Sequence, residues 1–189
     1  MQNTEADKYM NKAWQHFKTI THHKYLVMKG CFQIGLYRQG LLHDLSKYSP
    51  TEFLVGARYY QGTRSPNNAE REEQGYSSAW LHHKGRNKHH YEYWSDYSLT
   101  KHGMVPVPMP TEYVLEMFID RIAASKVYRG KQYRDSDPLA YYLGAKDHNL
   151  IHEKTRKQLE FLLRMLARDG EEKTFRYIRT KILRGHIVW

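Results

Sequence analysis

His43 and Asp44 stand side by side, and their neighbours Leu41, Leu42 and Leu45 are apolar. Burying two ionisable groups in such a segment is costly unless a partner compensates them. A divalent metal ion is one such partner. An exposed turn that leaves the pair in water is the simpler explanation, so other residues must decide between the two.

Three other features favour a metal. His23 precedes the pair, Asp120 interrupts an otherwise apolar helical pattern, and four histidines lie in the segment 82–90. Each also has an ordinary explanation: a core histidine bonded to a backbone carbonyl, a carboxylate paired with an arginine, and a basic turn in water. Together they favour one site, because imidazole and carboxylate ligands suit Mn, Fe, Co, Ni or Zn.

One ion would be held by His23, His43, Asp44 and Asp120, with positions left open for water and substrate. A second ion would need further imidazoles, which the segment 82–90 could supply, with Asp44 as a bridge. Two neighbouring ions polarise a phosphoryl group and activate a water as nucleophile at neutral pH. The chemistry that this set predicts is therefore metal-assisted hydrolysis, with one or two ions.

Hydrophobic periodicity predicts the elements that must position these residues. Residues 6–34 read as one long helix, and its apolar face carries His16, Ile20, His23, Val27, Cys31 and Ile34. His22 would point about 100 degrees away from that face, so His23 is the better ligand candidate. After a break at Gly35 and Gly40, the residues Leu41–Lys47 read as helical again.

The next start signal is Ser49-Pro50-Thr51-Glu52, which resembles a capping box with proline at the first helical position. It predicts a helix from Pro50 to Tyr60. The polar residues 61–68 predict an exposed loop. A further helix begins near Ser77 and leads into the segment 82–90.

The remaining chain predicts a long loop and more helices. Residues 95–110 contain three prolines, and we expect a loop that could cover a pocket. Residues 111–129 read as a helix with Asp120 on its apolar face, 135–138 mark another helix start, and 152–169 and 171–183 read as amphipathic helices separated at Asp169-Gly170. No strand pair is evident. We expect an all-α single domain over residues 1–189, with about seven or eight helices.

Composition limits the class of protein. A chain of 189 residues can bury a core without disulfides or structural zinc. The single cysteine, Cys31, excludes an internal disulfide, and no secretion signal or apolar run of membrane-spanning length is visible, so we expect a cytoplasmic protein with no membrane partner. The net charge of +10 favours polyanionic partners. The sequence does not indicate an oligomeric state.

The site residues resemble the HD-domain superfamily of metal-dependent phosphohydrolases, whose pattern is a histidine, then His-Asp, then a distal aspartate on an all-helical fold. The match is His23, His43-Asp44 and Asp120. The run 40–47, GLLHDLSK, looks like the motif of binuclear members, and 118–122, FIDRI, resembles the distal aspartate segment. This HD-like core covers about 13–129, and the helices of about 138–184 follow it. The run AWLHHKGRNKHHYEYW is similar to one in a bacterial family with no assigned activity.

The resemblance implies a role for each matching residue. His23, His43, Asp44 and Asp120 would be the primary ligands, and Asp44 would also be catalytic. His83 and His90 would be second-metal ligands, with His82 and His89 orienting them from behind, although the choice within each histidine pair stays open. Lys47 would bind phosphate or stabilise the transition state. The cations that lie beside these positions in sequence, and could bind further phosphates, are Lys84, Arg86, Lys88 and Arg121.

Three functions remain to be compared. The first is an enzyme that hydrolyses a nucleotide or other small phosphate ester, and this is the function that we favour. The second uses the same ligands to hold two irons that activate dioxygen and oxidise a small molecule. The third is a basic helical nucleic-acid-binding protein without catalysis, which we rank lower because no recognised nucleic-acid module is visible. A structural role with a vestigial site is ranked similarly.

Overall fold

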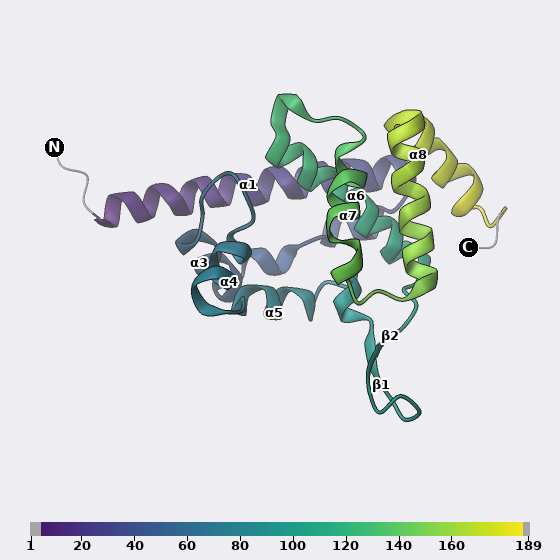
Figure 1. The fold of residues 1–189 in the computed structure, drawn as a ribbon. Helices are drawn as coiled ribbons and strands as arrows, with labels where there is room; N and C mark the ends of the chain where they lie inside the picture. The colour runs from purple at the N-terminus through teal and green to yellow at the C-terminus, as the bar shows by residue number, and fades with distance from the viewer. Residues whose placement is uncertain (1–4, 187–189) are drawn as a thin grey trace.

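The computed structural model describes residues 5–186, and helices dominate it (Figure 1). Its α-helices are α1 (Glu5–Ile34), α2 (Tyr37–Leu42), α3 (Pro50–Arg58), α4 (Pro66–Gln74), α5 (Ser78–Lys84), α6 (Thr111–Arg129), α7 (Asp137–Ala145) and α8 (Glu153–Tyr177). Short 3-10 helices are η1 (Leu45–Tyr48), η2 (Tyr91–Tyr93), η3 (Gly130–Gln132) and η4 (Lys146–His148), and a π-helix, η5 (Ile178–Ile182), follows α8. The predicted all-α fold class is confirmed.

Helix α1 is the longest element and runs through the molecule (Figure 1). All six residues of the predicted face, from His16 to Ile34, are buried, whereas His22 is exposed. The periodicity therefore placed His23 correctly on the inner face of the helix. That face packs against α6, α2 and α3.

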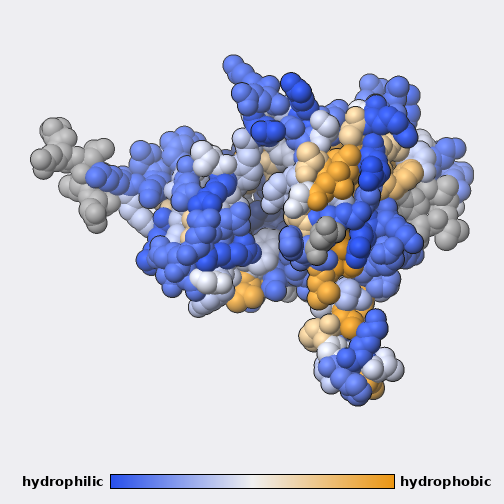
Figure 2. Space-filling view, viewed as in Figure 1, coloured by the Kyte–Doolittle hydropathy of each residue, from blue (hydrophilic) through white to orange (hydrophobic). Residues whose placement is uncertain are grey.

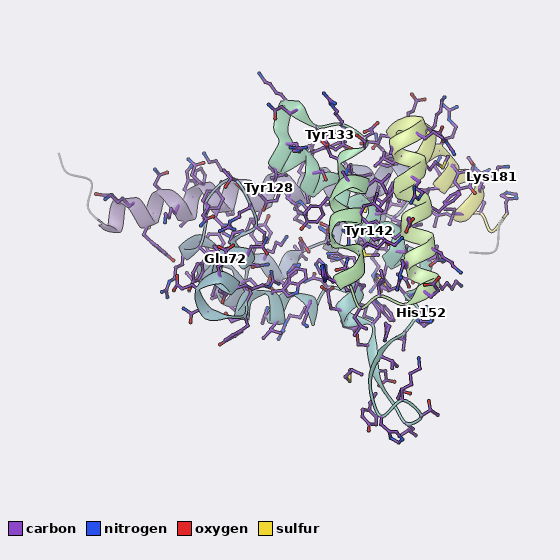
Figure 3. All side chains as sticks on the ribbon, viewed as in Figure 1. Glu72, Tyr128, Tyr133, Tyr142, His152 and Lys181 are labelled. Carbon is purple, nitrogen blue, oxygen red and sulfur yellow. The ribbon has the colours of Figure 1, made fainter. Side chains whose placement is uncertain are left out.

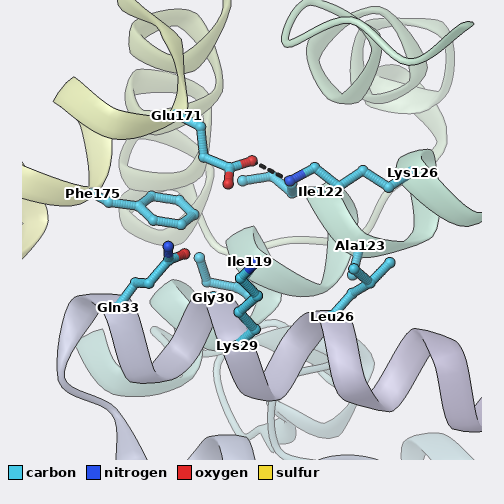
Figure 4. Close-up of a pocket in the computed structure, with 10 residues that line it drawn as sticks. All are labelled: Leu26, Lys29, Gly30, Gln33, Ile119, Ile122, Ala123, Lys126, Glu171 and Phe175. Carbon is cyan, nitrogen blue, oxygen red and sulfur yellow. Dashed lines mark hydrogen bonds and ion pairs between the residues drawn. The ribbon is translucent and has the colours of Figure 1, made fainter. Parts of the chain in front are cut away.

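The hydrophobic core lies where α1, α6 and α8 meet. Val27, Phe118 and Leu162 are fully buried representatives of these three helices. Figure 4 shows a small cavity of about 90 Å³ between them, with the ion pair of Lys126 and Glu171 beside it. Gly30 permits this close packing, because a Cβ there would lie 2.7 Å from Cγ2 of Ile119. The contact fixes α1, which carries His23, against α6, which carries Asp120.

The C-terminal helices complete this core. Tyr142 of α7 is 1% exposed and its hydroxyl faces Glu160 of α8 at 3.5 Å (Figure 3). The predicted separation at Asp169-Gly170 is present as a break inside α8, where Gly170 has a φ of 82° and a ψ of 168°. No helix among residues 5–186 is long and apolar enough to cross a membrane.

The structure corrects three local predictions. Leu41–Lys47 is not one helix, because α2 ends at Leu42 and Asp44 adopts a left-handed conformation before η1. The predicted exposed loop of residues 61–68 ends before Pro66, where α4 begins, and the sequence did not predict this helix. This helix has few apolar residues and is anchored by the buried Glu70, which accepts hydrogen bonds from Ser77 and Ser78.

The third correction concerns residues 95–110, where no strand pair was expected. β1 (Ser95–Ser98) and β2 (Gly103–Pro106) form an antiparallel hairpin with Ser95 opposite Pro106 and Ser98 opposite Gly103. The strands are too short and too exposed to produce a clear alternating pattern. The hairpin projects away from the helical body (Figure 1), and no described residue of 95–110 lines the large cavity discussed below. It therefore does not cover that cavity.

Candidate metal centre

The four residues His23, His43, Asp44 and Asp120 come together in the structure. One ligand atom from each lies within 4.8 Å of the others, so the group could hold a metal ion. Nε2 of His23 is 2.9 Å from Oδ1 of Asp120 and 3.6 Å from Oδ2 of Asp44. Nε2 of His43 lies 3.3 Å from the same Asp44 oxygen and 3.6 Å from Asp120 Oδ1. We refer to these four residues as group one.

The backbone at Asp44 is what turns this pair inward. Asp44 has a φ of 54°, a left-handed conformation that aspartate tolerates better than most residues. Lys24 of α1 donates hydrogen bonds to the carbonyl oxygens of Leu41 at 2.7 Å and His43 at 2.9 Å, which ties the end of α2 to α1. A left-handed residue outside glycine is strained, and such strain occurs often at functional sites.

His43 and Asp44 are buried for a different reason from the one that the sequence suggested. Leu41, Leu42 and Leu45 are 55%, 53% and 49% exposed, whereas His43 and Asp44 are 2% and 1% exposed. The apolar neighbours therefore point to solvent and the polar pair points into the molecule. The partners of the pair on α1, α5 and α6 bury it, not the leucines.

A second group of four, Asp44, His83, His89 and His90, meets the same 4.8 Å limit and could also hold an ion. Nε2 of His83 lies 3.3 Å from Oδ1 of Asp44, and Nε2 of His89 lies 3.4 Å from it. His90 packs against His83 and His89 with ring centroids 4.8 and 4.1 Å away. We refer to this set as group two. Asp44 is the shared member, with Oδ2 toward group one and Oδ1 toward group two.

The placement of the four histidines differs in part from the prediction. His83 and His90 lie in group two as expected, and His82 lies behind them. His89, which we expected to orient a ligand from behind, instead presents its Nε2 to Asp44 at a distance similar to that of His83. The turn is held by Asn87, whose side-chain amide donates to the carbonyl of His83 at 2.8 Å and to Ser46 Oγ at 2.8 Å.

Two glutamates that the sequence analysis did not include in the site hold the imidazoles from behind. Oε1 of Glu116, on α6, lies 2.9 Å from Nδ1 of His43 and 3.2 Å from Nδ1 of His89. Glu52, on α3, lies 2.7 Å from Nδ1 of His83 and 2.6 Å from Nδ1 of His82. Such contacts fix the ring orientation and direct Nε2 toward a metal.

The structure also changes the reading of Glu52 as a capping residue. Ser49 is at the N-cap position of α3, but its side chain makes no capping hydrogen bond. The carboxylate of Glu52 contacts His82 and His83 instead. A carboxylate beside two imidazoles gains more than one at an exposed helix start, because charge-assisted hydrogen bonds are stronger when buried.

The donor set fits a metal ion. The buried side-chain atoms in the described chain that make no hydrogen bond of good geometry include Nε2 of His23, His43, His83, His89 and His90 and both carboxylate oxygens of Asp44. Two of them have a charged neighbour, because Lys47 pairs with Oδ2 of Asp44 and Asp120 lies 2.9 Å from Nε2 of His23. Buried polar atoms are normally satisfied, so seven such atoms facing one region call for a common partner. Imidazole nitrogens and carboxylate oxygens are ligands for a borderline divalent ion.

The charges at the site are arranged for a cation. Burial disfavours ionisation of Asp44, but His43, Lys47 and His83 outweigh it and hold the pKa of Asp44 well below its ordinary value. The pKa of Asp120 is likewise far below normal, because His23 and His43 outweigh its burial. Both carboxylates are therefore ionised at neutral pH.

Four of the five imidazoles in the two groups divide into two kinds. Burial, assisted by Lys47, lowers the pKa of His23, and burial with His89 and His83 lowers that of His90 well below normal. Burial also opposes a charge on His43 and His83, but Asp44 and the neighbouring carboxylates overcome it and raise the pKa of each. Each group thus contains one imidazole already neutral and one whose proton a metal ion would displace.

A cavity of about 690 Å³ opens beside the centre, and the face in Figure 2 is hollowed between the α3–α4 side and the α7 side. Its wall includes His23, His83, His90 and Asp120, together with Lys47. Nζ of Lys47 lies 2.6 Å from Oδ2 of Asp44. A small molecule in this cavity would reach both groups.

The predicted substrate-binding cations separate into two sets. Arg121 lines the cavity, as does Tyr128, which lies about two turns further along the same helix (Figure 3). Lys84, Arg86 and Lys88 do not line it; Arg86 donates to the carbonyl of His82 at 3.2 Å and Lys88 lies over the rings of Tyr93 and Tyr113. Lys84 is the last residue of α5, and Arg86 and Lys88 lie in the turn after it, so closeness in sequence to the histidines did not place them at the cavity.

Fold and site together define an all-helical protein with a buried cluster of histidines and aspartates able to hold metal. The family model for DUF5662, a family of unknown function, matches residues 12–165, and the chain belongs to this family. No curated protein and no solved structure matches the chain. The match covers every residue of groups one and two.

Proposed function

We propose that this protein is a metal-dependent phosphohydrolase that acts on a nucleotide or other small phosphate ester. The observation that carries the proposal is the shared carboxylate of Asp44. Its two oxygens face two separate sets of imidazoles, and both sets adjoin one cavity. Two ions held this way would polarise a phosphoryl group and lower the pKa of a bound water.

In this proposal the chain's own residues hold and orient the reacting groups. His23, His43 and Asp120 would complete the first ion's ligands, and His83, His89 and His90 the second's. Glu116 and Glu52 keep the imidazoles in position. Water would attack phosphorus, the bond from phosphorus to the leaving alkoxide oxygen would break, and that oxygen would take up a proton, giving an alcohol and phosphate.

Lys47 is the proposed cation for the phosphoryl group. Its ammonium group borders the cavity beside Asp44. Its pairing with Asp44 and the nearby charge of Asp120 outweigh burial and raise its pKa, so it is charged at neutral pH. A fixed positive charge there would stabilise the negative charge that develops on the phosphoryl oxygens. Such a group stabilises the transition state more than it strengthens metal binding.

The test is hydrolysis by purified protein loaded with Mn, Co, Ni or Fe, with a general phosphoester and a panel of nucleotides. Lys47→Ala should lower the rate by about tenfold to a thousandfold. Its metal content should stay close to that of the wild type. Lys84→Ala is the matched control, because Lys84 lies outside the cavity, and we expect it to keep full activity.

Other outcomes would replace the proposal. No turnover of any phosphorylated compound, combined with oxygen consumption by the iron form, would assign the site to a di-iron oxygenase of a small molecule. Binding of nucleic acid that weakens steeply with salt and survives loss of the histidines would assign the protein's function to its basic surface.

A further inference from the structure

Three residues on the cavity wall have buried polar atoms that the metal centre does not explain, and one of them is His16, through Nδ1. Nε of Arg121 and Oε2 of Glu92 are both buried without a hydrogen-bond partner, and both residues line the cavity. One is a donor and the other an acceptor. Leaving either unsatisfied costs free energy, and the cost is larger for charged groups.

Arg121 is also distinctive among the cations of the cavity wall. Of the four that the described residues provide, Lys47 pairs with Asp44, Arg64 with Glu72 and Arg129 with Asp137. Arg121 has no ion pair within residues 5–186. Its guanidinium instead lies 5.8 Å from the centre of the Tyr142 ring. The cation is held in place while its hydrogen-bonding capacity stays free.

The two residues lie next to the metal-site residues in sequence. Arg121 follows Asp120 on α6, and Glu92 comes two residues after His90. Tyr91 also lines the cavity, and its hydroxyl donates to Oδ1 of Asn149 at 2.8 Å. Burial raises the pKa of this hydroxyl, the charge of Glu92 raises it further and the charge of Arg121 lowers it, so both residues lie near it. His90 and Asp120 line the same cavity as Arg121 and Glu92, so a ligand that fills it would also reach the metal centre.

The shape and lining of the cavity indicate what would bind there. Five aromatic residues line its wall: Tyr60, Trp80, Tyr91, Tyr128 and Tyr141. Aromatic faces favour flat rings, and a volume of about 690 Å³ exceeds the need of a single phosphate. The guanidinium of Arg121 and the carboxylate of Glu92, both on the wall of this cavity, would then contact the edge of that ring.

We infer that Arg121 and Glu92 bind a planar heterocycle that carries a hydrogen-bond acceptor beside two donors, as the edge of guanine does. The acceptor would pair with Arg121 and the donors with the carboxylate of Glu92. This inference rests on the proposed function, and it makes the substrate a phosphate ester of a nucleoside-like compound. Specificity would reside in these two side chains, and the chemistry in the metal centre.

The test uses guanosine, which has no phosphate, and measures its binding to the metal-loaded protein by calorimetry. We expect guanosine to bind more tightly than adenosine or uridine. Arg121→Gln and Glu92→Gln should each lower the affinity for guanosine by about tenfold to a hundredfold, because each removes a hydrogen bond to a charged group. Arg38→Gln, on the exposed surface of α2, is the control and should bind like the wild type. Thermal unfolding of each variant checks that it is folded.

Two outcomes would overturn the inference: no binding of guanosine to the wild type, or equal binding to the wild type and to both folded variants. Tight binding of serine, a zwitterion without a ring, in place of guanosine would also overturn it. The two proposals fail separately. Guanosine binding without phosphoester hydrolysis would refute only the hydrolase, and hydrolysis without guanosine binding would refute only the recognition of the ring.

Discussion

Groups one and two share Asp44 but are built in different ways. Group one joins residues from α1, the turn after α2, and α6, which are far apart in sequence and meet in the main core. Apart from Asp44, group two comes from α5 and the turn that follows it. Long-range helix packing positions the first group. Polar side-chain contacts hold the second, from Asn87 in its own turn and from Glu52 of α3 and Glu116 of α6.

This difference has a consequence for the ions. The close contact of Gly30 with Ile119 fixes α1 against α6, so the ligands of group one are organised by the fold itself. Group two depends on a short helix and a turn. We therefore expect group one to bind its ion more tightly, because a preorganised site loses less conformational entropy on binding.

The largest effect is expected from substituting Asp44, the residue that groups one and two share. Asp44→Asn keeps the size of the side chain and a residue type that tolerates the left-handed backbone, but removes the charge. We expect both ions to be lost, as judged by metal content after dialysis, while the helical circular dichroism spectrum is retained. Asp96→Asn on the exposed hairpin is the control. Retention of one ion would show that only one group uses Asp44.

Substitutions of the two supporting glutamates should affect the two groups differently. Glu116 contacts His43 and His89, one from each group, whereas Glu52 contacts His83 of group two and His82. Glu116→Gln should lower the affinity for both ions by about tenfold to a hundredfold. Glu52→Gln should lower only the affinity for the second ion, by a similar factor. Titration with a divalent ion, followed by calorimetry, measures both. Equal effects of the two variants on both ions would contradict the division into groups.

The smallest expected effect is that of pH. The pKa of His43 and of His83 is raised above the ordinary value of about 6.5, whereas that of His23 and of His90 is lowered. Each ion would then displace a proton from one raised imidazole. Affinity should rise with pH by about tenfold per unit while this imidazole is still protonated in the metal-free protein, and the rise should end where the pH passes its raised pKa, with a similar slope for both ions. Affinities that do not change between about pH 6.5 and 8 would rule out displacement of these protons.

The parts of the site predicted from sequence were those carried by local pattern. The apolar stripe of α1 selected His23 over His22, and one carboxylate in an apolar helix drew attention to Asp120. His43 and Asp44 were recognised as a pair, but for a wrong reason, because the flanking leucines are exposed. Helical periodicity describes which face is buried, whereas the left-handed turn at Asp44 is a single-residue feature without a period.

The parts that were missed depend on contacts between distant segments. Glu52 contacts His83 from another helix, and its own sequence context matched a capping box. Glu116 did have a usable signal, because it lies four residues before Asp120 and so falls on a neighbouring part of the same helical face. His89 could not be separated from His90 by pattern, since a turn rather than a helix determines which ring faces Asp44.

The number of ions that the protein holds tests the central claim most directly. A metal-replete sample should be analysed for metal per chain, and an anomalous scattering map should locate each ion. We predict two ions on opposite sides of Asp44, one beside His23 and Asp120 and the other beside His83 and His89. A fully loaded protein that contains a single ion, or ions bound away from Asp44, would contradict this account.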